Sequence, residues 1–177
     1  MRRSAIVALA VAVTVMLPAL SLAQTASGTL AVTATVQSSI SLTFVSNAGG
    51  VALGGSGTNT ATLAFGNISA FGALPAGVSR PSVTAIDFTV RSPFNVVVQK
   101  SNSASANYTL TARLASADAI NTWSVAGKVI TNASATTVVT TGAYGGAGTA
   151  FNLDLKIPFA ESSGLISNTI NFSATAN

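Results

Sequence analysis

The 177-residue chain contains no cysteine and no histidine. Without cysteine there is no disulfide framework and no thiolate chemistry, so the fold has to be held by burial of apolar side chains and by β-ladders. Without histidine the chain lacks the commonest general base near neutral pH and the commonest transition-metal ligand. These two absences exclude the enzymes and metal sites that depend on cysteine or histidine side chains.

Acidic side chains are also scarce. The chain has four, Asp87, Asp118, Asp154 and Glu161, and none has another acid within six positions. A paired-carboxylate glycosidase or a calcium loop needs carboxylates that converge. Asp87 and Asp154 fall on the polar faces of predicted strands, where we expect solvated carboxylates. We therefore predict no enzymatic activity, no catalytic residue, no cofactor-binding or metal site and no small-molecule substrate.

Charge of either sign is rare. Charged residues make up 7% of the sequence, whereas soluble domains usually have roughly 25%. Apart from Arg2 and Arg3 the basic residues are scattered singly, so no patch could follow a phosphate backbone, and we predict no nucleic-acid partner. A surface of Ser, Thr, Asn, Gly and Ala repels its neighbours weakly, which suits packing against copies of the same chain. Compositional drift in an exported protein would give the same composition, so this feature alone decides nothing.

The first 23 residues are typical of a cleavable export signal. A positively charged start is followed by an apolar, uncharged run over residues 5–20, and Ser21 and Ala23 supply small residues before a cut at Gln24. A membrane anchor is the alternative, but the run is shorter than the about 20 apolar residues of a span and contains a proline. The sequence predicts export, through the periplasm, to the cell surface or the medium.

The mature chain begins with a long stretch of alternating apolar and polar residues. Apolar side chains occupy nearly every second position, at Leu30, Val32, Ala34, Val36, Ile40, Leu42 and Phe44. This period of two is typical of β-strands. Because strands usually have about 5–6 residues, two interpretations remain open: one long strand that bends across two sheets, or two strands in one register with a break near Gln37.

The same alternation recurs along the chain. It marks residues 84–90, 94–98, 108–114, 123–125, 151–157 and 166–174, and two short apolar pairs, 129–130 and 138–139, predict further short strands. Pro93 is expected to break the strand before it, since proline cannot donate to a ladder. Residues 126–128 predict a hairpin connection, and residues 118–121 a single helical turn. Seven to nine short strands without a long amphipathic helix predict one antiparallel β-sandwich domain.

Both ends of the mature chain resemble the subunits of chaperone–usher pili, especially the archaic branch, and the related spore-coat-protein-U-like secreted domains. The start, residues 25–36, is similar to the N-terminal extension of that family, and the end, residues 164–177, is similar to its C-terminal strand, with Gly164 fourteenth from the end. Two departures are the absence of the family's cysteines and Ala176 in place of the usual aromatic residue near the C-terminus.

The resemblance implies an immunoglobulin-like sandwich that lacks one strand, which the extension of a neighbouring copy supplies. It implies a fimbrial structural subunit that forms a homopolymer, with a periplasmic chaperone and an outer-membrane usher as partners and a role in cell adhesion. The corresponding organisation is a signal over 1–23, an extension over 24–37 and a sandwich over 38–177.

The residues that the resemblance singles out form two rows. The donor strand would present Leu30, Val32, Ala34 and Val36, and the C-terminal strand at the acceptor groove would present Gly164, Ile166, Ile170, Phe172 and Ala174. Pairing of residues 28–37 within their own domain remains open. The alternative function is a monomeric secreted module that binds a surface or a carbohydrate.

Overall fold

The computed structural model describes residues 27–177, and the expected export signal lies outside this range. Residues 27–35 belong to one unit, and the sandwich, Val36–Asn177, is the other. No helix is present in the described residues, and accordingly none could cross a membrane. The sandwich contains nine strands: β1 (Ser39–Ser46), β2 (Ser79–Val83), β3 (Asp87–Ser101), β4 (Tyr108–Leu114), β5 (Thr122–Val125), β6 (Lys128–Ile130), β7 (Thr136–Gly142), β8 (Thr149–Pro158) and β9 (Ile170–Ala176).

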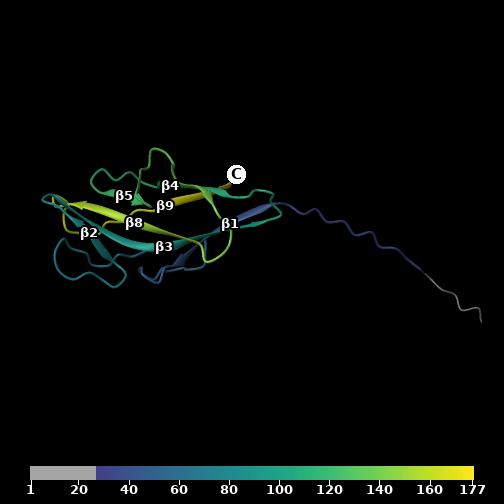
Figure 1. Cartoon of the computed structure of the whole chain (residues 1–177), viewed down its shortest axis with the longest axis horizontal. Coiled ribbons are helices and arrows are strands. Elements are labelled where there is room, and N and C mark those ends of the chain that lie inside the picture. The colour runs from purple at the N-terminus through teal and green to yellow at the C-terminus, as the bar shows by residue number, and fades with distance from the viewer. Residues whose placement is uncertain (1–26) are drawn as a thin grey trace, which may run out of the picture. The chain divides into compact units, whose positions relative to one another are not determined.

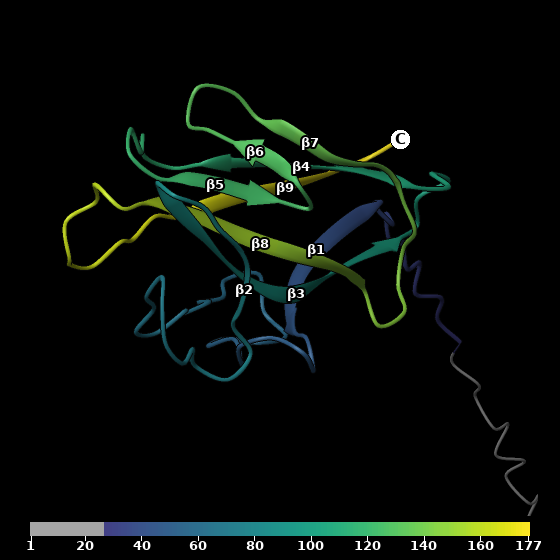
Figure 2. The same ribbon diagram turned by 60° about the vertical axis from the view of Figure 1, so that its left-hand side comes forward.

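The strands form two antiparallel sheets, which confirms the predicted all-β antiparallel fold (Figure 1). The larger sheet has the order β1-β3-β8-β5-β6, with β2 paired to the first half of β3, and the smaller sheet has the order β7-β4-β9. Figure 2 shows β7, β4 and β9 on one side of the sandwich and β3 and β1 on the other. The core lies between them, because strand faces alternate and the inward faces are apolar.

The two lateral sides of the sandwich differ. On one side the sheets approach through β6 and β7, where Thr136 Oγ1 donates to the carbonyl of Val129 at 3.2 Å, and the amide of Leu114 in β4 donates to Thr131 at 3.0 Å. On the other side β1 and β9 are the outermost strands, and no ladder joins them. The sandwich is therefore closed along one side and open along the other.

Pro93 does not break its strand, so that prediction is wrong. β3 runs without interruption from Asp87 to Ser101. The amides of the odd-numbered residues of β3 point toward the edge shared by β1 and β2, and pairing with β1 starts at Phe94 while pairing with β2 ends at Arg91. The nitrogen of Pro93 thus faces the gap between the two partners, where no hydrogen bond is required.

The hairpin predicted at residues 126–128 is confirmed. Ala126 and Gly127 connect β5 to β6, and both have positive φ, 51° and 74°. This is the backbone conformation that a two-residue hairpin needs, because its twist matches that of the paired strands.

The sandwich has two distinct ends, a proximal end and a distal end. At the proximal end lie the starts of β1 and β4 and the ends of β3 and β9, because Ser39 pairs with Ser101 and Tyr108 pairs with Ala176. At the distal end lie the start of β3 and the ends of β2 and β8, since Asp87 pairs with Pro158. In Figure 1 the proximal end is on the right and the distal end on the left.

Candidate functional site

The outer edge of β9 is unpaired in the described part of the chain. β9 forms a ladder with β4 only. The amide of Ala115 donates to Thr169, and that of Asn177 donates to Asn107, so odd-numbered residues of β9 are the ones bonded to β4. Because hydrogen-bonding direction alternates along an antiparallel strand, the backbone groups of the even-numbered residues point to the outer edge.

The outer edge of β1 is arranged in the same way. The amide of Phe44 donates to Thr58 at 2.8 Å and its carbonyl accepts from Gly57 at 2.6 Å, on the side away from β3. By alternation the backbone groups of Ile40 and Leu42 point to that side as well. Along Ile40 and Leu42 this edge has no ladder partner among the described residues. Two exposed edges of this kind invite the addition of a strand.

A groove of about 1570 Å³ lies between the two edges. Its floor is formed by core side chains of the larger sheet, Phe94, Trp123, Leu153 and Leu155. One wall is formed by residues 164–172, and the other by residues 40–44 together with the loop segment 58–68. No lining residue carries a charge.

The apolar side chains of the walls are only half-buried. Leu42, Phe44, Ile170 and Phe172 pack against the core, yet none of them belongs to its fully buried part. The Phe172 ring contacts Phe44 edge-on at 5.3 Å and lies 5.9 Å from Phe94, measured between ring centroids. These rings bring the two sheet edges together at one point. Along the rest of the groove a row of apolar side chains lacks the cover that the core of a complete sandwich would provide.

The predicted C-terminal residues gather along one wall of this groove. Gly164, Ile166, Ile170 and Phe172 line it, and Ala174 is half-buried on the same face of β9 but lies beyond the lining. The structure therefore brings four of these five residues together on the open side of the sandwich.

The predicted donor residues lie before the first strand. Leu30, Val32, Ala34 and Val36 are all exposed, with exposed fractions of 88% for Leu30, 81% for Val32 and 72% for Val36. Residues 27–38 form no strand, and the alternating stretch becomes a strand only at Ser39. The interpretation as one long strand is therefore wrong, and of the two strands in the other interpretation the structure contains only the one that follows the break near Gln37.

The sequence pattern did not predict the second wall of the groove. Ile40, Leu42 and Phe44 were recognised as strand residues, but nothing in their spacing says that their strand is an open edge. Leu63 and Phe65 form a short apolar segment in a Gly-rich region, and the structure places this segment against β1 without making it a strand. Both features depend on contacts between distant parts of the chain.

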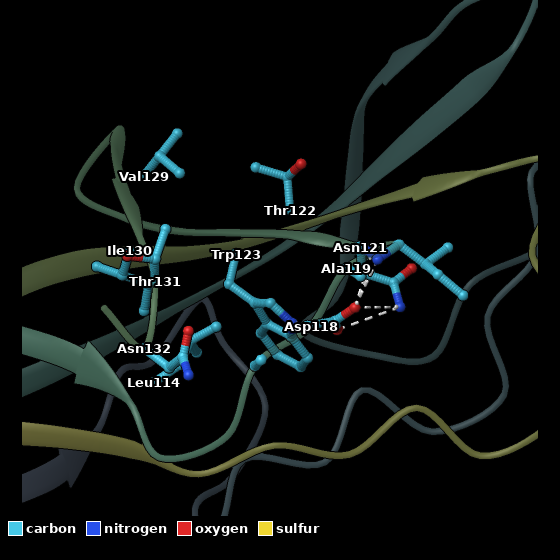
Figure 3. A pocket seen from close by; sticks show the side chains of 12 residues that line it. Leu114, Asp118, Ala119, Asn121, Thr122, Trp123, Val129, Ile130, Thr131 and Asn132 are labelled. Carbon is cyan, nitrogen blue, oxygen red and sulfur yellow. Dashed lines mark hydrogen bonds between the residues drawn. The ribbon is translucent and has the colours of Figure 1, made fainter. Parts of the chain in front are cut away.

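Asp118 and its neighbours form a polar cluster at the distal end (Figure 3). The Asp118 carboxylate accepts hydrogen bonds from the amides of Ile120 and Asn121, at 3.1 and 2.8 Å, and from Trp123 Nε1 at 2.7 Å. The predicted helical turn is therefore wrong, because the carboxylate itself closes this turn. Burial raises the pKa of Asp118, but the bonds from Trp123 and the turn more than offset this and hold its pKa below the ordinary value.

This arrangement predicts a dependence of stability on acid. The lowered pKa means that the ionised carboxylate stabilises the folded state above the ordinary carboxyl pKa of about 3.9. That contribution is lost as the pH falls through the lower, folded-state value. We expect the melting temperature of the parent protein to decrease when the pH is lowered below about 4. Asp118→Asn should be less stable by about 1–2 kcal/mol at neutral pH, and its melting temperature should decrease less in acid. Thermal unfolding followed by circular dichroism at several pH values checks this. An acid-induced decline of unchanged size in Asp118→Asn would contradict it.

The other two aspartates are buried, and the expectation of solvated carboxylates is wrong. Asp87 and Asp154 have exposed fractions of 6% and 8%. Arg91 lies opposite Asp154 across the β3–β8 ladder and bonds to it in a bidentate pair at 2.6 and 3.0 Å, while Lys156 contacts Asp87 at 2.9 Å. The hydrogen bond from Lys156 lowers the pKa of Asp87. These carboxylates are occupied by structural ion pairs.

No group of three or more acidic, histidine or cysteine side chains that could hold a metal ion occurs in residues 27–177. Searches against protein-family models, curated proteins and solved structures find no match to this chain.

Proposed function

We propose that the protein is an extracellular structural subunit of a surface filament, a pilin-like subunit that polymerises when the N-terminal extension of one copy fills the groove of the next. The observation that carries this proposal is the uncharged groove between two sheet edges with unpaired backbone groups. A strand inserted there would pair with both edges and cover the half-buried row of apolar side chains.

The extension has the properties that such a strand needs. Residues 28–36 are as many as residues 164–172, which form one wall of the groove. Leu30, Val32, Ala34 and Val36 would all face inward, because side chains alternate along a strand. Burial of the three larger residues, with a smaller addition from Ala34, contributes about 5–10 kcal/mol in gross terms. The cost of ordering the extension must be subtracted from this.

The position of β1 favours insertion into another copy over insertion into the same one. To reach its own groove, the extension would have to fold back along β1, which begins at Ser39. A turn formed by Gln37 and Ser38 pairs even-numbered extension residues with odd-numbered residues of β1, so Leu30 and Val32 would face away from the groove. A three-residue turn would restore the register, but it removes Val36 from the strand and needs a residue with positive φ, usually glycine, which residues 36–38 lack.

The alternative of a monomeric binding module has less support. Such a module usually binds through exposed Trp or Tyr rings, whereas Trp123 and Tyr108 have exposed fractions of 6% and 0%, and Tyr144 packs against Tyr108 at 5.4 Å. The aromatic rings that are exposed belong to phenylalanines at the distal end, which offer no hydrogen-bonding group to a carbohydrate. The proposed subunit would travel through the periplasm, where a chaperone would protect the open groove before an usher assembles the filament.

Electron microscopy of the purified mature protein tests the proposal. We expect filaments whose subunits remain joined without covalent links, since the chain has no cysteine. Size-exclusion chromatography with light scattering measures the same assembly in solution. A protein that stays monomeric across a wide range of concentrations, with no filaments on cells or after purification, would contradict the proposal.

A further inference from the structure

An exposed apolar cluster lies at the distal end of the sandwich, away from the groove lining. It consists of Phe71, Ile86 and Phe159, with exposed fractions of 74%, 72% and 42%. The Phe71 and Phe159 rings are 6.2 Å apart, and the amide of Phe159 donates to the carbonyl of Ile86 at 2.8 Å. Large side chains that gather on a surface in this way usually mark a contact with a partner.

The loop that carries Phe71 is held in place. The Arg80 guanidinium donates to the carbonyl of Ser69 at 3.1 and 2.8 Å and to that of Gly72 at 3.1 Å. Phe159 in turn stacks on the buried Phe88 at 6.2 Å. The cluster is thus presented by a fixed surface, which lowers the entropic cost of docking.

We infer that this distal cluster is a second contact between subunits, and that it docks on the proximal end of the copy whose extension occupies the groove. The inference rests on the proposed function. If residues 30–36 of one copy occupy the groove of another, only residues 37 and 38 remain before β1 of the first copy begins. Two residues span at most about 7 Å, so the proximal end of the donor must touch the acceptor.

The direction of the inserted strand decides which end is touched. The groove runs from Ile40 near the proximal end to residues 164–166 near the distal end. If Val36 left the groove at the proximal end, the proximal end of the donor would contact the proximal end of the acceptor. The extension of the acceptor also starts at that end, so the donor would obstruct it. Exit at the distal end gives a head-to-tail chain that can continue. The inserted strand then runs antiparallel to β9.

The proximal end suits an apolar partner. Residues 101–107 and 143–148 contain no charged residue, and Ala104 and Ala106 are exposed there. The neighbouring Lys100 is engaged within its own subunit, because its ammonium group donates to the carbonyl of Ser105 and lies 5.0 Å from the centre of the Tyr144 ring. Tyr144 Oη donates to the carbonyl of Asn107 at 3.0 Å, and Asn177 Nδ2 bonds to the carbonyl of Thr140 at 2.9 Å. Small side chains on an ordered surface allow aromatic rings to approach closely.

Cross-linking is a direct test, because the chain has no cysteine of its own. In filaments of the full mature chain with Ile86→Cys and Ala104→Cys, a short thiol-reactive cross-linker should give a ladder of covalent oligomers. The matched control, Val129→Cys with Ala104→Cys, places one thiol on exposed β6 and should give none. Cross-linked dimers from Ile86→Cys alone, or equal ladders from both pairs, would overturn the inference.

Substitution of the cluster separates this contact from the groove. Phe71→Ser with Ile86→Ser should raise the monomer concentration in equilibrium with filaments by about tenfold or more, whereas Val129→Ser should leave it unchanged. Binding of a labelled peptide of residues 24–37 to a Val32→Asp chain should be the same with and without the two serine substitutions. Unchanged filament equilibria would overturn the inference alone, whereas failure of the peptide to bind in either background would overturn the proposed function as well.

Discussion

Val32→Asp is expected to abolish filament assembly while leaving the sandwich folded. Val32 is 81% exposed before assembly, so the substitution should change the free energy of unfolding of the monomer by less than about 0.5 kcal/mol. In the groove, however, the carboxylate would be buried against uncharged walls without a partner, at a cost of several kcal/mol. Sedimentation or light scattering of the mature protein measures the loss of assembly.

Thr33→Asp is the matched control, because it adds the same charge one position away. Side chains of neighbouring strand residues point to opposite faces, so this carboxylate would remain in solvent. Assembly should be retained or only slightly weakened. If the two variants assemble equally well, or fail equally, the extension does not enter a groove with the expected face.

Removal of residues 24–37 is expected to give a folded monomer with an empty groove. The deletion leaves β1 complete, since β1 starts at Ser39. A synthetic peptide of residues 24–37 should bind this monomer and raise its melting temperature, because a ligand that binds only the folded state stabilises it. Thermal unfolding with and without peptide, and isothermal titration calorimetry, measure the effect.

The same peptide with Val32→Asp is the control and should bind far more weakly. If the shortened chain is unfolded and the peptide does not restore it, residues 28–37 belong to their own domain. The filament proposal would then lose its main support. If the shortened chain is folded but does not bind the peptide, residues 24–37 are not the segment that fills the groove.

The sequence predicted the class of fold because strand alternation is a local signal. It located β4 and β8 well, since apolar residues such as Leu110 and Leu153 occupy one face of each strand. It found β9 but placed its start four residues too early, at residue 166 instead of Ile170. It failed at Pro93, because β3 continues through the proline only where no neighbouring strand requires its amide. Pro93 lies between the end of the pairing with β2 and the start of the pairing with β1. It also failed for Asp87 and Asp154, because each forms its ion pair across the ladder between β3 and β8, with a residue far away in the sequence.

The candidate site was predictable only in part for the same reason. The C-terminal wall, with Ile170 and Phe172, follows from a continuous alternating segment at the end of the chain. The opposite wall combines β1 with residues 58–68, which carry little local pattern. The openness between β1 and β9 is a property of strand order, and strand order is not encoded by periodicity.

The lack of charge along the groove has a consequence for the environment in which a filament could persist. A junction formed only by apolar burial and backbone hydrogen bonds has no ion pair for dissolved salt to screen. Its strength should be nearly the same in fresh water and in brine. Apolar burial weakens on cooling, however, so such a junction would be firmest in warm surroundings and would loosen first in the cold.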